Sequence, residues 1–148
     1  MCADISKIVF VVDNITHLSM LYCGFKYHRT SIIHFPLVLP PRPLTLCTLN
    51  RSPVKALSYW LRPHTSTTKL PIVFLHGVGI GLWPYVNFLA ALNKGENDDG
   101  EVGIIAIEIL PISFRITQQA LGKEDMCRQI ENILLQHGFG HFVLVAHS

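Results

Sequence analysis

The chain has 148 residues, of which 49% are apolar and only 15% are Asp, Glu, Lys or Arg, and its formal net charge is +2. This length suits one domain, and so small and scattered a positive charge excludes a nucleic-acid-binding surface. The charged share lies below the usual value of about 25%. We therefore expect either that something covers the excess apolar surface or that part of the fold is missing.

The first 43 residues (1–43) are expected to form an N-terminal extension and connector. Ile8–Val12 is predicted to be a short buried strand. Because this run is too short for a signal-peptide core or a membrane span, we expect no targeting segment and favour a cytoplasmic location. Thr16–Cys23 is predicted to form one or two helical turns, with Thr16 as the N-cap and Gly24 just beyond the end. The proline-rich stretch Phe35–Pro43 cannot continue a helix or a central strand and indicates an extended connector.

Five strands are predicted from residue 44 onward. The first two have strand composition and are separated by a polar turn, whereas the other three are continuous apolar runs. Such runs are typical of strands that are buried on both faces of a sheet. The predicted strands are Leu44–Leu49, Val54–Arg62, Leu70–Leu75, Val102–Leu110 and Phe142–Ala146.

Two helices are predicted between the apolar strands. Pro84 suits a first helical turn, which Tyr85–Asn93 continues. The second helix, Lys123–His137, has acidic residues in its first turn and Gly138 placed to terminate it. Its apolar stripe consists of Met126, Ile130, Ile133 and Leu134. The alternation of strands and helices favours the α/β class, with a mostly parallel sheet covered by helices on both faces and chemistry at the carboxyl ends of the strands.

The glycine-rich turn His76-Gly77-Val78-Gly79 follows the predicted strand Leu70–Leu75. Glycines let backbone N–H groups approach a ligand closely, and an oxyanion hole needs such donors. A dinucleotide-binding fingerprint would need a third glycine where Leu82 stands, and a P-loop would need Gly-Lys followed by Ser or Thr. The remaining alternative is a plain tight turn between a strand and a helix.

Ser148 follows the predicted strand Phe142–Ala146, with His147 between them, and is the residue at which the chain stops. A nucleophile elbow places a serine on a sharp turn after a buried strand, with small residues two positions before and after it. Ala146 supplies the small residue before Ser148. This half of the motif is weak alone, because many buried strands end in a serine.

Taken together, the segments LPIVFLHGVGIG and FVLVAHS resemble the α/β-hydrolase superfamily and occur in the family's order. The segments SYWLRPH and LWPYVNFLAAL look like an uncharacterised fungal branch. The resemblance covers about residues 44–148 and implies the N-terminal half of an α/β-hydrolase domain that ends at the nucleophile. The family's catalytic acid and histidine follow the nucleophile in chain order, so no histidine of this chain is assigned the role of base.

The resemblance assigns a role to each residue that matches the family's motifs. Ser148 matches the nucleophile, His76, Gly77 and Gly79 match the turn that binds oxyanion and substrate, and the backbone N–H of Val78 matches an oxyanion donor. The apolar stretch from Glu108 onward lacks the Asp and the glycines that many members carry there. The resemblance therefore implies no substrate class.

The implied function is that of a serine hydrolase acting on an ester, amide or related acyl bond of a small molecule, without a metal or other cofactor. We expect residues 1–148 alone to be inactive, and poorly soluble because Phe142–Ala146 would become an apolar edge strand. The alternative is a non-catalytic binding protein on the same fold. The residues that follow Ser148 in a full-length transcript would distinguish the two. The oligomeric state is not predicted.

We expect the other candidate residues to have structural roles. His137 and His141 are interpreted as turn or surface histidines, because glycines interrupt the helix that would align them on a metal. Cys127 is predicted to be a small core residue, and Trp60 and Trp83 to be packing residues, although Trp83 could line a pocket. The four cysteines have no paired spacing, so free thiols are expected: Cys2, Cys23, Cys47 and Cys127.

Overall fold

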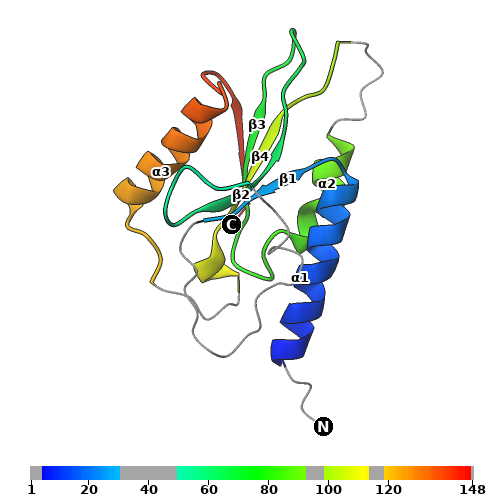
Figure 1. Ribbon diagram of the computed structural model, residues 1–148, viewed down its shortest axis with the longest axis vertical. Helices are drawn as coiled ribbons and strands as arrows, with labels where there is room; N and C mark the ends of the chain where they lie inside the picture. Colours follow the sequence, from blue (N-terminus) through cyan, green and yellow to red (C-terminus); the bar gives the residue numbers. More distant parts are fainter. Residues whose placement is uncertain (1–4, 31–49, 93–98, 114–118, 148) are drawn as a thin grey trace.

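A mixed five-stranded sheet forms the centre of the molecule in the computed structural model, which describes residues 5–30, 50–92, 99–113 and 119–147 (Figure 1). The strand order is β1-β2-β4-β3-β5. The central strand β4 is buried at all five residues, as expected for an apolar run with neighbours on both sides. The strands are β1 (Lys26–His28), β2 (Ser58–Arg62), β3 (Ile72–Leu75), β4 (Ile104–Glu108) and β5 (Val143–Ala146).

Parallel pairing is confined to the half of the sheet that the apolar runs form. β3 pairs in parallel with both β4 and β5, whereas β2 pairs antiparallel with β1 and β4. The α/β class is thus confirmed, with a sheet that is parallel in one half and antiparallel in the other.

Helices cover both faces of the sheet, as predicted. Helix α3 (Lys123–Gln136) packs Ile133 and Leu134 into one core cluster, with Met126 and Ile130 at its margin. Helices α1 (Ile5–Tyr22) and α2 (Val86–Ala91) lie on the opposite face (Figure 1). The second core cluster on that face includes Met20 of α1, Leu89 of α2, and Trp60 and Phe74 of the sheet.

The N-terminal region differs from the sequence prediction. Ile8–Val12 is helical, so the predicted strand is wrong, because a short apolar run does not by itself distinguish a strand from a buried helix. Thr16 lies inside α1 rather than at its N-cap, and its Oγ1 donates to the carbonyl of Val12 at 2.7 Å. Gly24 ends the helix as predicted, with φ of 80°. β1, from the predicted extension, pairs with β2.

Several element boundaries also differ. β2 starts at Ser58 rather than Val54, since a turn precedes it in which the Ser52 hydroxyl donates to the carbonyl of Leu57. Pro84 lies in a 3₁₀ turn, Trp83–Tyr85, that leads into α2. The predicted segments Phe35–Pro43 and Leu44–Leu49 lie outside the described residues.

The apolar run of β5 indicated a strand buried on both faces of a complete sheet, and an edge strand in residues 1–148 alone. Among the described strands β5 is a largely exposed edge strand, in line with the second expectation. Within the described residues, no helix is both long enough and apolar enough to cross a membrane.

Candidate active site

The parallel pairing of β3 with β5 brings the predicted turn and the end of β5 together. Leu75, the last residue of β3, pairs with Ala146, and the N–H of His147 donates to the carbonyl of Leu75 at 3.1 Å. The turn that starts at His76 therefore lies beside the residue that precedes Ser148. Ser148 itself lies outside the described residues.

Gly77 occupies a position at which backbone approaches backbone. A Cβ atom on Gly77 would lie 2.8 Å from the carbonyl oxygen and 3.1 Å from the ring Nδ1 of His147. The first contact is with main chain, which cannot move aside as a flexible side chain would. The close approach of the two strand ends thus requires glycine at this position.

The side chain of His76 is buried and is not exposed at a surface. Its Nδ1 lies 2.8 Å from the carbonyl oxygen of Gly77, and its Nε2 accepts from the N–H of Ile109 at 3.0 Å. An acceptor at Nε2 requires the tautomer with its proton on Nδ1. His76 therefore joins the ends of β3 and β4 and positions the turn.

The two residues after Gly77, Val78 and Gly79, differ in whether their backbone N–H groups donate a hydrogen bond within the described residues. The N–H of Gly79 donates to the carbonyl of Ile112 at 3.0 Å, so it is already engaged. The N–H of Val78 has no acceptor among the described residues, and the Val78 side chain is exposed. Of these two donors, only the N–H of Val78 is without an acceptor in the described part of the chain.

Two further side chains at this edge had no signal in the sequence. The hydroxyl of Tyr85 lies 2.8 Å from Nδ1 of His147 and so holds the ring that precedes Ser148. Ser113 is buried beside the turn, and its Oγ donates to the carbonyl of Ile109 at 2.8 Å. Tyr85 was predicted only as a helical residue, because nothing in its local pattern marks a contact that spans 62 positions.

A buried carboxylate lies at the end of β4. Glu108 Oε2 accepts a hydrogen bond from the hydroxyl of Tyr27 at 2.8 Å, and both side chains are buried. Tyr27 belongs to β1, so this bond crosses the antiparallel half of the sheet. In the sequence, Glu108 begins the stretch that departs from the family pattern, and no local pattern indicates its bond to Tyr27.

The other residues considered in the sequence analysis do not belong to this turn. His137 Nε2 lies 2.7 Å from the hydroxyl of Tyr59, and burial lowers the pKa of His137. Trp60 is a buried core residue, as predicted, and Trp83 lines a cavity between α1 and α2 of about 650 Å³. Cys127 is exposed, so its predicted core position is wrong.

Metal binding has no support in the described ranges, where no three His, Cys, Asp or Glu side chains are grouped closely enough to hold an ion. Cys23 and Cys127 are free thiols. No family model, curated protein or solved structure matches the chain.

Proposed function

We propose that this chain forms the N-terminal half of a serine hydrolase of the α/β-hydrolase type, with Ser148 as the nucleophile. The observation that carries the proposal is the contact between Gly77 and the backbone of His147, where a Cβ atom would lie only 2.8 Å from a carbonyl oxygen. This contact brings a backbone donor turn next to the residue before the serine.

The chemistry would be acyl transfer to water. Ser148 Oγ bonds to the carbonyl carbon of an ester or amide while a base takes its proton, and the resulting oxyanion accepts a hydrogen bond from the N–H of Val78. When this intermediate collapses, the C–O or C–N bond breaks and the base gives its proton to the leaving group, which departs as an alcohol or amine. Water then hydrolyses the acyl-enzyme that remains. The family's order places the base and its acid after Ser148.

The hydrogen bonds of the turn support this assignment. His76 and Gly79 are tied to neighbouring segments, which leaves the N–H of Val78 fixed in place but without an acceptor among the described residues. Preorganised donors of this kind stabilise developing charge without reorganisation in the reaction. The outer edge of β5, where later strands pair in the family's order, is unpaired among the described strands.

The proposal is tested by covalent labelling of full-length protein with a fluorophosphonate probe. We expect labelling in the wild type, its loss in Ser148→Ala, and its retention in Ser52→Ala, a serine of the turn before β2. Labelling that persists in Ser148→Ala would contradict the nucleophile assignment. A wild type that is not labelled, and that has no acid and histidine after Ser148, would favour a non-catalytic binding protein.

A further inference from the structure

His147 is exposed, yet three different segments hold it in place. Its N–H donates to the carbonyl of Leu75 at 3.1 Å, and its carbonyl oxygen would lie 2.8 Å from a Cβ atom on Gly77. The hydroxyl of Tyr85 lies 2.8 Å from Nδ1 of its ring. The first two contacts fix the main chain, and the third fixes the side chain. An exposed imidazole would otherwise change rotamer, so Tyr85 removes the freedom that the backbone contacts leave.

Tyr85 is itself fixed from two sides. Its ring packs against Phe74 of β3, with the ring centroids 4.9 Å apart, and Phe74 is buried. Its N–H donates to the carbonyl of Leu82 at 3.0 Å, which closes the 3₁₀ turn, and Pro84 restricts the backbone of that turn. A group that positions another residue must have little freedom of its own, and Tyr85 meets this requirement.

The loop that leads to Tyr85 also carries Val78, whose N–H is the proposed oxyanion donor. Between these two residues, the N–H of Gly79 is bonded to a neighbouring segment and the side chain of Leu82 is buried in a core cluster. The loop is therefore attached to the rest of the fold between the donor and the tyrosine. The bond from Tyr85 to His147 then sets the distance between this loop and the strand end that precedes the serine.

We propose that Tyr85 is a positioning residue of the serine hydrolase: by holding His147, it keeps Ser148 and the N–H of Val78 in the relative positions that acyl transfer requires. This inference rests on the proposed function. The rate of such a reaction depends steeply on geometry, and a displacement of about 1 Å can cost about a hundredfold. Loss of one hydroxyl bond, with the backbone contacts of His147 retained, should cost less, about tenfold.

Steady-state hydrolysis of p-nitrophenyl butyrate by the full-length protein tests this role. We expect Tyr85→Phe to lower kcat about tenfold and to change KM less than about twofold, because the lost bond orients the reacting groups and does not bind substrate. Tyr59→Phe is the matched control, since the hydroxyl of Tyr59 lies 2.7 Å from Nε2 of His137 in the antiparallel half of the sheet. This control should leave kcat unchanged, and circular dichroism checks that both variants fold.

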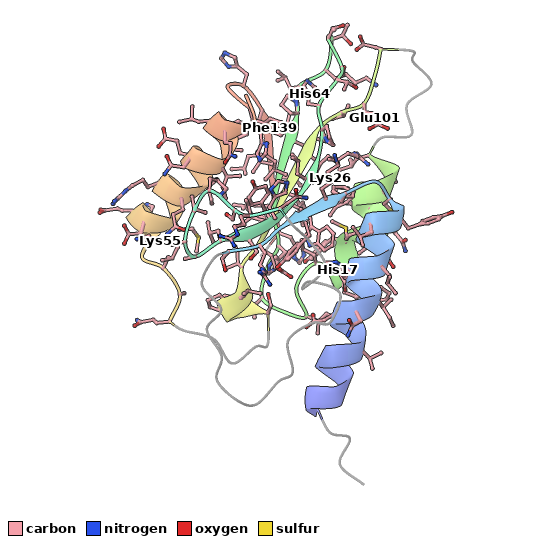
Figure 2. All side chains as sticks on the ribbon, in the orientation of Figure 1. His17, Lys26, Lys55, His64, Glu101 and Phe139 are labelled. Atoms are coloured by element: carbon pink, nitrogen blue, oxygen red, sulfur yellow. The ribbon has the colours of Figure 1, made fainter. Side chains whose placement is uncertain are left out.

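A double-mutant cycle shows whether Tyr85 acts through His147. In a His147→Ala background, Tyr85→Phe should have no further effect on kcat. His64→Ala is the control background, because Nδ1 of His64 accepts from the N–H of Gly103 at 3.0 Å, just before β4 begins. Figure 2 shows His64 at the end of the sheet that is remote from the C-terminus marked in Figure 1. In this background Tyr85→Phe should still lower kcat about tenfold.

A conservative variant of the histidine provides a rescue. His147→Asn keeps a polar atom at the δ position, so it should retain most of the wild-type kcat, and Tyr85→Phe should lower kcat again in this background.

Three results would overturn the positioning role of Tyr85 alone. They are an unchanged kcat in Tyr85→Phe, a rise in KM without a fall in kcat, which would assign Tyr85 to substrate binding, and a loss that persists in His147→Ala, which would place the hydroxyl directly on the reacting groups. Wild-type hydrolysis that does not depend on Ser148 would instead overturn the proposed function and this role with it. That result is recognised in Ser148→Ala, before any variant of Tyr85 is compared.

Discussion

The buried imidazole of His76 accepts a hydrogen bond through Nε2 from the backbone N–H of Ile109 at 3.0 Å. His76 follows β3 and Ile109 follows β4, so this bond joins the ends of two neighbouring strands. The other ring nitrogen lies 2.8 Å from the carbonyl oxygen of Gly77. One side chain thus fixes both the start of the proposed oxyanion turn and its place in the sheet.

His76→Ala should lower the free energy of unfolding by about 1–3 kcal/mol, because the buried N–H of Ile109 would lose its acceptor. Urea denaturation followed by circular dichroism measures this change. His141→Ala removes an exposed histidine and should change the free energy by less than about 0.5 kcal/mol. Equal effects of the two substitutions would contradict the role assigned to His76.

Gly77→Ala should destabilise the protein by about 1–3 kcal/mol, since its Cβ would collide with the carbonyl oxygen of His147 and force the two strand ends apart. The matched control is Gly140→Ala, where an added Cβ meets nothing within 4 Å. Thermal unfolding compares the two. In the full-length hydrolase, Gly77→Ala should also reduce acyl transfer, whereas wild-type turnover would show that the close approach has no part in the site.

Asp99 should stabilise the fold at neutral pH and lose this effect in acid. Hydroxyls of Thr67, Thr68 and Ser66 donate to its carboxylate, and these bonds hold the pKa of Asp99 well below its usual range. A lowered pKa in the folded state gives stability above the unfolded value of about 3.9 that is lost as the pH falls below it.

Asp99→Asn should therefore lower the Tm at pH about 7, with a difference from wild type that shrinks below pH about 4. Asp125→Asn is the control, because its partner Arg128 forms an exposed pair on α3, and such pairs contribute little. A difference between Asp99→Asn and wild type that is constant with pH would contradict this account.

A cluster of aromatic rings between β1, β2 and the end of α3 should make stability depend on pH near 6. The ring of His28 stacks on Tyr59 at 4.6 Å, and Tyr59 bonds His137. Burial lowers the pKa of both histidines, and for His28 the neighbouring His137 and Lys26 lower it further. The unfolded chain then binds more protons, so stability is complete above about pH 6.5 and falls as the pH drops below that value.

His137→Gln should flatten this dependence, as measured by the midpoint of urea unfolding between about pH 5 and pH 7.5. His141→Gln, which changes an exposed histidine four positions further on, should leave it unaltered. If His137→Gln keeps the wild-type slope, the cluster does not cause the pH dependence.

Apolar periodicity predicted the parts of the fold in which local pattern and burial agree. The predicted apolar stripe of α3 packs into a core cluster. The apolar run around Val73 forms a strand, and Val73 is buried in the same cluster. The same reasoning failed for Ile8–Val12, where β-branched residues occur inside α1. The sequence of α1 has apolar residues on both sides of the helix. It therefore lacks the helical periodicity that identifies an amphipathic helix.

The candidate site was predictable only where local geometry demands a particular residue. Gly77 is required by a close approach, and the turn it belongs to was found from the sequence. The bonds of Tyr85 to His147 and of His76 to Ile109 join segments that are distant in sequence, and many residue types occur at such positions. A single sequence contains no signal for contacts of this kind.

The exposed edge of β5 should control the solubility of residues 1–148. β5 pairs only with β3 among the described strands, and the segment Phe142–Ala146 has neither a charge nor a proline to hinder pairing with another chain. Leu144→Lys should therefore raise the concentration at which light scattering appears, while the free energy of unfolding changes by less than about 0.5 kcal/mol. Leu135→Lys is the control, because Leu135 is a leucine at least as exposed as Leu144 (69% against 58%) that lies on α3 and not on a strand edge. It should improve solubility less. Equal improvement by both substitutions would mean that exposed apolar area in general, rather than strand pairing at β5, limits solubility.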